Sequence, residues 1–90
     1  MLLAVLSTSR AGTFKQRIER RLKWSYPEGA RVIAEYWLQT PDPQVITFVE
    51  TDDLAPIMAA TSQWDDVFTF RVVPALTAEQ GIEMAKRMMS

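Results

Sequence analysis

The fold is decided by residues 30–51, ARVIAEYWLQTPDPQVITFVET, in which two segments rich in β-branched and aromatic residues flank Pro41-Asp42-Pro43. Such residues favour β-strands. Neither proline can donate a backbone hydrogen bond, so the chain has to leave the sheet ladder between the two segments. We therefore predict strands at residues 30–39 and 44–51, joined by a hairpin connection.

A strand and a helix are predicted before this hairpin. Residues 2–7 form a short apolar run, which is typical of a buried strand. Thr13 and Gln16 have the spacing of a capping box, which marks the start of a helix that has to end before Pro27. The apolar stripe of this helix comprises Phe14, Ile18 and Leu22.

A second helix, a fourth strand and a terminal helix are predicted after the hairpin. Asp52 or Asp53 is expected to cap the second helix. The apolar face of that helix comprises Leu54, Ile57, Met58 and Thr61. The fourth strand spans residues 67–76, and the last helix begins at Thr77. Alternation along the fourth strand places Phe68, Phe70 and Val72 on one side and Thr69 and Arg71 on the other.

This order of elements predicts one α+β domain over residues 1–90, a ferredoxin-like βαββαβ unit with a C-terminal helix and a four-stranded antiparallel sheet. Two helices cover only one face of such a sheet, yet both phases of the predicted strands carry large apolar residues. A second copy of the same face is the simplest cover for the other side. We therefore expect a homodimer with Trp37 in its interface.

The composition excludes several classes of function. The chain has no Cys and no His, which removes disulfide scaffolds, thiolate metal sites and the commonest general base. It has no Gly-rich phosphate loop or nucleophilic serine elbow, so neither a cofactor nor a metal is expected. Its longest apolar run, residues 1–6, is too short for a membrane span or a signal-peptide core. We expect a cytoplasmic protein without a membrane partner.

Charge is unevenly distributed along the chain. Residues 10–23 hold six basic side chains against Glu19 alone, a net charge of +5, whereas residues 24–70 hold eight acids against Arg31 alone, a net charge of −7. No aromatic stacking pattern or nucleic-acid motif accompanies the basic helix. It is best interpreted as a solvated helix face, and no nucleic-acid partner is expected.

Six residues are candidates for ligand binding: Glu35, Trp37, Glu50, Trp64, Thr69 and Arg71. Four of them, Glu35, Trp37, Thr69 and Arg71, are expected on the sheet face opposite Phe68 and Phe70. A charged residue within an apolar strand needs a partner or a ligand. Glu35 and Arg71 are therefore expected either to pair, within one subunit or across the dimer, or to orient a small polar ligand. Glu35 or Glu50 would have to serve as any general base.

Two short acidic motifs have alternative interpretations. Trp64-Asp65-Asp66 either lines the mouth of a pocket or, as we favour, places Trp64 as a plug between helix and sheet with an aspartate capping the turn. Asp52 and Asp53 resemble a helix cap more than a metal site, because adjacent carboxylates point in different directions.

Several segments resemble a family known as domain of unknown function 3303. The matching segments cover about the last two-thirds of the chain and comprise Pro27-Glu28-Gly29, Trp37, Glu50-Thr51-Asp52-Asp53, Trp64-Asp65-Asp66, Phe70 and Pro74. The resemblance implies the fold of the dimeric α/β-barrel group and a homodimer. It implies no reaction.

Two functions fit these observations. The first is a non-catalytic homodimeric domain that binds a small molecule or a protein. The alternative is a cofactor-free enzyme, such as a monooxygenase or an isomerase, because other dimeric α/β barrels carry out such chemistry between sheet and helices. This alternative depends on the resemblance in fold alone.

Overall fold

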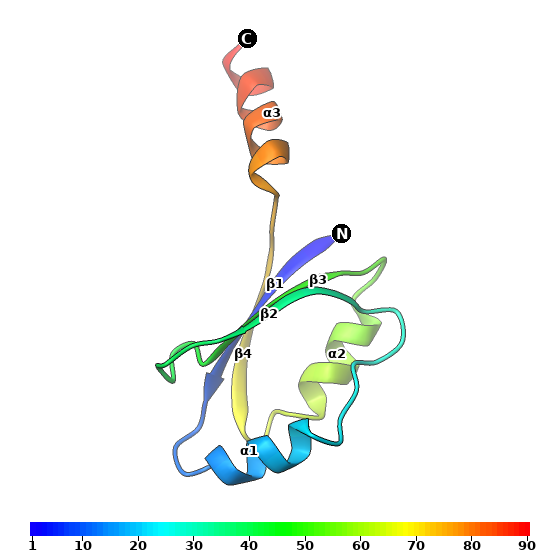
Figure 1. Cartoon of the computed structure of the whole chain (residues 1–90). Helices are drawn as coiled ribbons and strands as arrows, with labels where there is room; N and C mark the ends of the chain where they lie inside the picture. Colours follow the sequence, from blue (N-terminus) through cyan, green and yellow to red (C-terminus); the bar gives the residue numbers. More distant parts are fainter.

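The computed structural model describes residues 1–90 and has the predicted order of elements. These are β1 (Leu2–Ser9), α1 (Phe14–Arg21), β2 (Arg31–Trp37), β3 (Val45–Glu50), α2 (Ala55–Ser62), β4 (Phe68–Pro74) and α3 (Ala78–Met89). The strands form one antiparallel sheet in the order β2-β3-β1-β4. Figure 1 shows α1 and α2 on one face of the sheet, whereas α3 projects away from it. The predicted ferredoxin-like α+β fold is confirmed.

The sheet has two distinct faces, which we call the helix face and the open face. On the helix face, Leu3 of β1 lies opposite Val49 of β3, and both pack against Ile57 of α2. On the open face, Leu6 lies opposite Ile46. No helix covers the open face (Figure 1).

The core between sheet and helices consists of two small clusters. One comprises Leu3, Val5, Val49 and Ile57, and the other comprises Trp64, Val67 and Phe68. Ile57 is the one buried residue of α2, and α1 has none. Phe14 and Leu22 are 69% and 80% exposed, so the predicted stripe does not pack as a core surface. The predicted face of α2 is likewise wrong at Leu54 and Met58, which are exposed.

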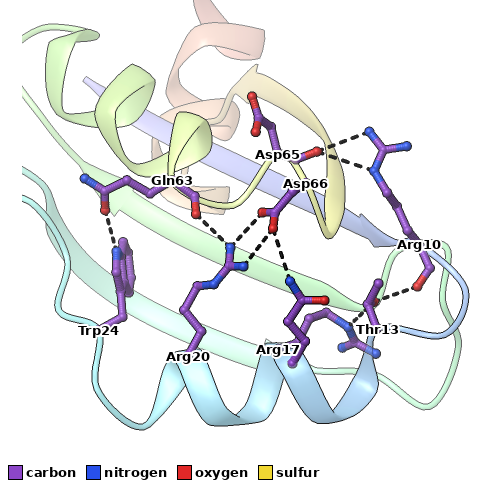
Figure 2. Close-up of polar contacts among 9 residues, drawn as sticks. Arg10, Thr13, Arg17, Arg20, Trp24, Gln63, Asp65 and Asp66 are labelled. Atoms are coloured by element: carbon purple, nitrogen blue, oxygen red, sulfur yellow. Dashed lines mark hydrogen bonds and ion pairs between the residues drawn. The ribbon is translucent and has the colours of Figure 1, made fainter.

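Helix α1 is held in place by polar contacts along its side (Figure 2). The Arg20 guanidinium donates to both carboxylate oxygens of Asp66, at 2.7 and 2.8 Å, and to the Gln63 carbonyl at 2.9 Å. This cation holds the pKa of the Asp66 carboxyl below its usual value. Gln16 also donates to Asp66, and the Trp24 indole donates to the Gln63 side chain. These contacts tie α1 to the segment between α2 and β4.

The capping box predicted at the start of α1 is absent. The Thr13 hydroxyl donates to the Arg10 carbonyl and accepts from Arg17 Nε, and the Gln16 side chain is bonded to Asp66. Both side chains of the predicted motif therefore have other partners.

The other two predicted helix starts have different outcomes. The N-cap of α2 is Leu54, which makes no side-chain capping bond, so the predicted cap at Asp52 or Asp53 is wrong by position. Asp53, one residue earlier, still accepts from the backbone N–H of Ala55 at 2.7 Å. A capping box is present at the start of α3, between Thr77 and Gln80. None of the helices has the length and apolar character of a membrane span.

A β-bulge in β2 reverses the faces that we predicted for the later residues of this strand. The pairing of β2 with β3 shifts between Val32 and Ala34, so Ile33 is the extra residue. A shift of one residue moves every later side chain to the other face. Glu35 and Trp37 consequently lie opposite Thr47 and Val45, on the helix face. The prediction that they share a face with Thr69 and Arg71 is wrong.

We predict that Ile57→Ala lowers the free energy of unfolding by about 2–5 kcal/mol, because it leaves a void in the centre of the larger core cluster. Met58→Ala on the same helix is the control: Met58 is 73% exposed, and the change should stay within about 0.5 kcal/mol. Urea unfolding of both variants measures the difference. Equal effects of the two substitutions would contradict this packing of α2.

Candidate functional site

A cavity of about 230 Å³ lies between the helix face of the sheet and the helices α1 and α2. All three tryptophans of the chain line it, together with the rings of Phe14, Phe68 and Phe70. The buried Ser7 and Thr47 add hydroxyl groups from the sheet. An apolar cavity of about 150 Å³ is known to accept benzene. The space here is therefore sufficient for one substituted ring.

The cavity exists because α1 covers the sheet without packing onto it. Four of its side chains, at positions one turn apart, line the space from above: Phe14, Arg17, Ile18 and Arg21. None of them is buried. The contacts of Arg20 and Gln16 with Asp66 fix this helix from its side and leave the space below it unfilled.

Glu35 is the centre of a polar cluster in the cavity lining. Its Oε1 accepts from the Tyr26 hydroxyl and, at 3.5 Å, from the Arg21 guanidinium, and its Oε2 accepts from the Trp37 indole at 2.6 Å. We call Tyr26, Arg21, Trp37 and Glu35 the Glu35 cluster. The Glu35 side chain is only 16% exposed. This largely buried carboxylate therefore accepts hydrogen bonds from three donors, which compensate for the loss of water around its charge.

Two pKa values in this cluster are shifted in opposite directions. Burial opposes ionisation of Glu35, but the hydrogen bonds from Tyr26 and Trp37 and the charge of Arg21 outweigh it and lower its pKa. Burial, followed by the hydrogen bond to the Glu35 carboxylate, raises the pKa of Tyr26 to about 12. Around neutral pH the cluster therefore holds an ionised Glu35 and a neutral phenol that donates to it.

The cavity brings together only half of the predicted site residues. Glu35, Trp37 and Trp64 line it, and Trp64 is buried beneath the Arg20 guanidinium, 5.1 Å from its ring. Glu35 and Arg71 lie on opposite faces of the sheet, so the predicted pair between them within one subunit is wrong.

The other three predicted residues lie outside the cavity. Thr69 and Arg71 are on the open face, where Arg71 is 3.8 Å from the Asp42 carboxylate. Glu50, also on the open face, is 2.7 Å from the amino group of Met1. No three acidic side chains lie close enough together to hold a metal ion.

Sequence reasoning missed Arg17, Arg21, Tyr26 and Trp24, all of which line the cavity. The spacing of residues along α1 could have indicated that the two arginines line the cavity. Residues 14, 17, 18 and 21 follow the spacing of one helix face, so the arginines share the stripe of Phe14 and Ile18. The interpretation of this helix face as solvated is therefore wrong for Arg17 and Arg21. The contact of Tyr26 with Glu35 has no such signal, because it depends on the bulge in β2.

We predict that Tyr26 titrates near pH 12, above its ordinary pKa of 10.0. The folded state prefers the protonated phenol, so its contribution to stability is fully present below pH 10 and is lost as the pH rises through about 12. Ultraviolet absorbance of tyrosinate in the wild type, minus that of Tyr26→Phe, isolates this phenol. A difference signal that titrates at pH 10 would contradict the contact with Glu35.

Comparison with known proteins yields a family but no characterised relative. No curated protein and no solved structure matches the chain. One family model, described as Domain of unknown function (DUF3303), matches residues 1–89, and this match extends the resemblance noted in the later segments to the first strand and helix. Because the match covers almost the entire sequence, the chain belongs to the DUF3303 family.

Proposed function

We propose that this protein is a small homodimeric domain that binds a small molecule in the cavity beneath α1. The observation that carries the proposal is the cavity itself, whose aromatic walls enclose a few fixed polar groups of the Glu35 cluster. Ligand sites in proteins typically combine an apolar lining with a few placed polar groups in this way. A concave site of this size favours a small molecule over a protein segment.

The Glu35 cluster favours binding over the alternative of a cofactor-free monooxygenase or isomerase. General acid–base catalysis works best with a group whose pKa is near the working pH. The pKa of Glu35 is lowered and that of Tyr26 is raised to about 12. Both oxygens of Glu35 already accept hydrogen bonds. Glu35 is therefore better suited to orienting its neighbours than to removing a proton.

We predict that Ala60→Leu abolishes binding of small aromatic molecules and leaves the fold intact, because Ala60 lines the cavity and leucine would occupy part of it. Ala59→Leu is the matched control, since Ala59 is on the same helix but is not part of the lining. The probes are benzyl alcohol, benzamide and benzoate at millimolar concentration.

Binding is followed by NMR from the indole N–H signals of the three tryptophans, all of which line the cavity. The proposal requires that the probes shift these signals in the wild type and in Ala59→Leu, and that the shifts disappear in Ala60→Leu. If no probe shifts the signals in the wild type, the proposed function is wrong.

The homodimer is supported by two apolar surfaces that lie uncovered in one chain. The open face carries Tyr36, Phe48 and Val73, and Tyr36 is 57% exposed. The apolar side of α3 is also exposed, including Ile82, Met84, Met88 and Met89. Two copies related by a two-fold axis would cover both surfaces without a further component. Pairing through the open face would give the arrangement of a dimeric α/β barrel.

We predict that the protein is a dimer at micromolar concentration and that Tyr36→Asp converts it to a folded monomer, because the new charge would be buried in the interface. Trp37 is not suitable for this test, since it lies on the helix face. Met58→Asp places the same charge on exposed α2 and should leave the dimer intact. Light scattering gives the mass. A wild-type monomer with a folded spectrum would refute the dimer.

A further inference from the structure

We infer that the small molecule is an organic carboxylate with a flat apolar body, whose acid group is bound by Arg17. This inference rests on the proposed function and assigns the chemical class of the ligand. It follows from the charge balance of the cavity, the surroundings of the Arg17 guanidinium and the rings that flank it.

The lining of the cavity holds one cation more than it holds anions. Its charged side chains are Arg17, Arg21 and Glu35. Arg21 and Glu35 form an ion pair at 3.5 Å and compensate each other. The net charge of the lining is therefore +1 and belongs to Arg17. A ligand with a single negative charge would neutralise it.

Arg17 is half-buried and has no acidic partner. Its Nε donates to the Thr13 hydroxyl at 3.0 Å, but neither Nη atom makes a hydrogen bond. On α1 and beside it, Glu19 is 3.9 Å from Lys15 and Asp66 is bonded to Arg20, so neither acid is paired with Arg17. A guanidinium has five N–H donors, and its two terminal nitrogens match the two oxygens of a carboxylate.

The aromatic rings around Arg17 hold its side chain in place. They also form a surface against which the flat apolar body of the ligand can pack. The guanidinium carbon is 5.8 Å from the centre of the Phe14 ring and 5.5 Å from that of Phe68. Phe70 continues this wall, with its ring 5.7 Å from that of Phe68. Contacts of this kind restrict the side chain before a ligand arrives, which reduces the ordering cost of binding.

The experiment compares benzoate with benzamide, its neutral analogue of the same shape, by titration calorimetry. We expect the wild type to bind benzoate about tenfold more tightly or better, because hydrogen bonds to a charged partner are the stronger ones. Arg17→Met keeps an apolar chain between the two phenylalanines but removes the charge. It should remove the preference by weakening benzoate about ten- to a hundredfold, with benzamide nearly unaffected.

Lys23→Gln is the control, because Lys23 follows α1 and is exposed but does not line the cavity. It should leave the preference for benzoate intact. A second readout does not depend on a variant: the Nε–H signal of Arg17 in the wild type should shift with benzoate and much less with benzamide.

The possible failures are distinguishable. Equal affinity of the wild type for the two probes would refute the carboxylate while leaving the proposed function standing. An equal loss of benzoate binding in Arg17→Met and Lys23→Gln would likewise refute a specific role of Arg17. Absence of binding by both probes would overturn the proposed function, and this inference with it.

Discussion

The pair between Arg20 and Asp66 determines where α1 lies, and the cavity depends on that position. When a helix packs through its apolar stripe, its side chains interlock with those of the sheet, and no space remains between helix and sheet. Helix α1 buries no residue. Hydrogen bonds from Arg20 and Gln16 to Asp66 and from Arg20 to the Gln63 carbonyl hold it at its side. The ion pair of Arg21 with Glu35, at 3.5 Å, adds a polar contact with β2. Directional contacts of this type fix the distance between α1 and the sheet, whereas apolar packing would bring the two into contact.

The order of elements could be predicted from the sequence because several boundaries have a local cause. Pro41 and Pro43 separate two strands of high β propensity, and Thr77 with Gln80 starts the terminal helix by a capping box that is present. How closely α1 packs against the sheet could not be predicted in the same way. The stripe of Phe14, Ile18 and Leu22 has the right period, but whether such a stripe reaches the core depends on contacts made 40 or more residues away, at Asp66.

The candidate site was predictable only in part, for the same reason. A charged residue within an apolar strand correctly indicated that Glu35 needs a partner, but the partner is different. Alternation along β2 pointed to Arg71, and the bulge at Ile33 turned Glu35 instead toward Tyr26 and Arg21. A bulge changes which face a residue occupies without altering the composition that predicts the strand. Positions before it keep their predicted face, and positions after it do not.

The same bulge has a consequence for the solution behaviour of the protein. Strand β2 is at the edge of the sheet, where unpaired backbone groups can recruit strands from other molecules. A bulge interrupts the regular spacing of those groups and increases the local twist, which makes the edge a poor template for further pairing. The residue that turns Glu35 inward thus also makes this edge of the sheet less regular. Deletion of Ile33 would restore an uninterrupted edge and would also turn the Glu35 carboxylate outward. Loss of the Glu35 contacts and a tendency to aggregate would therefore arise together.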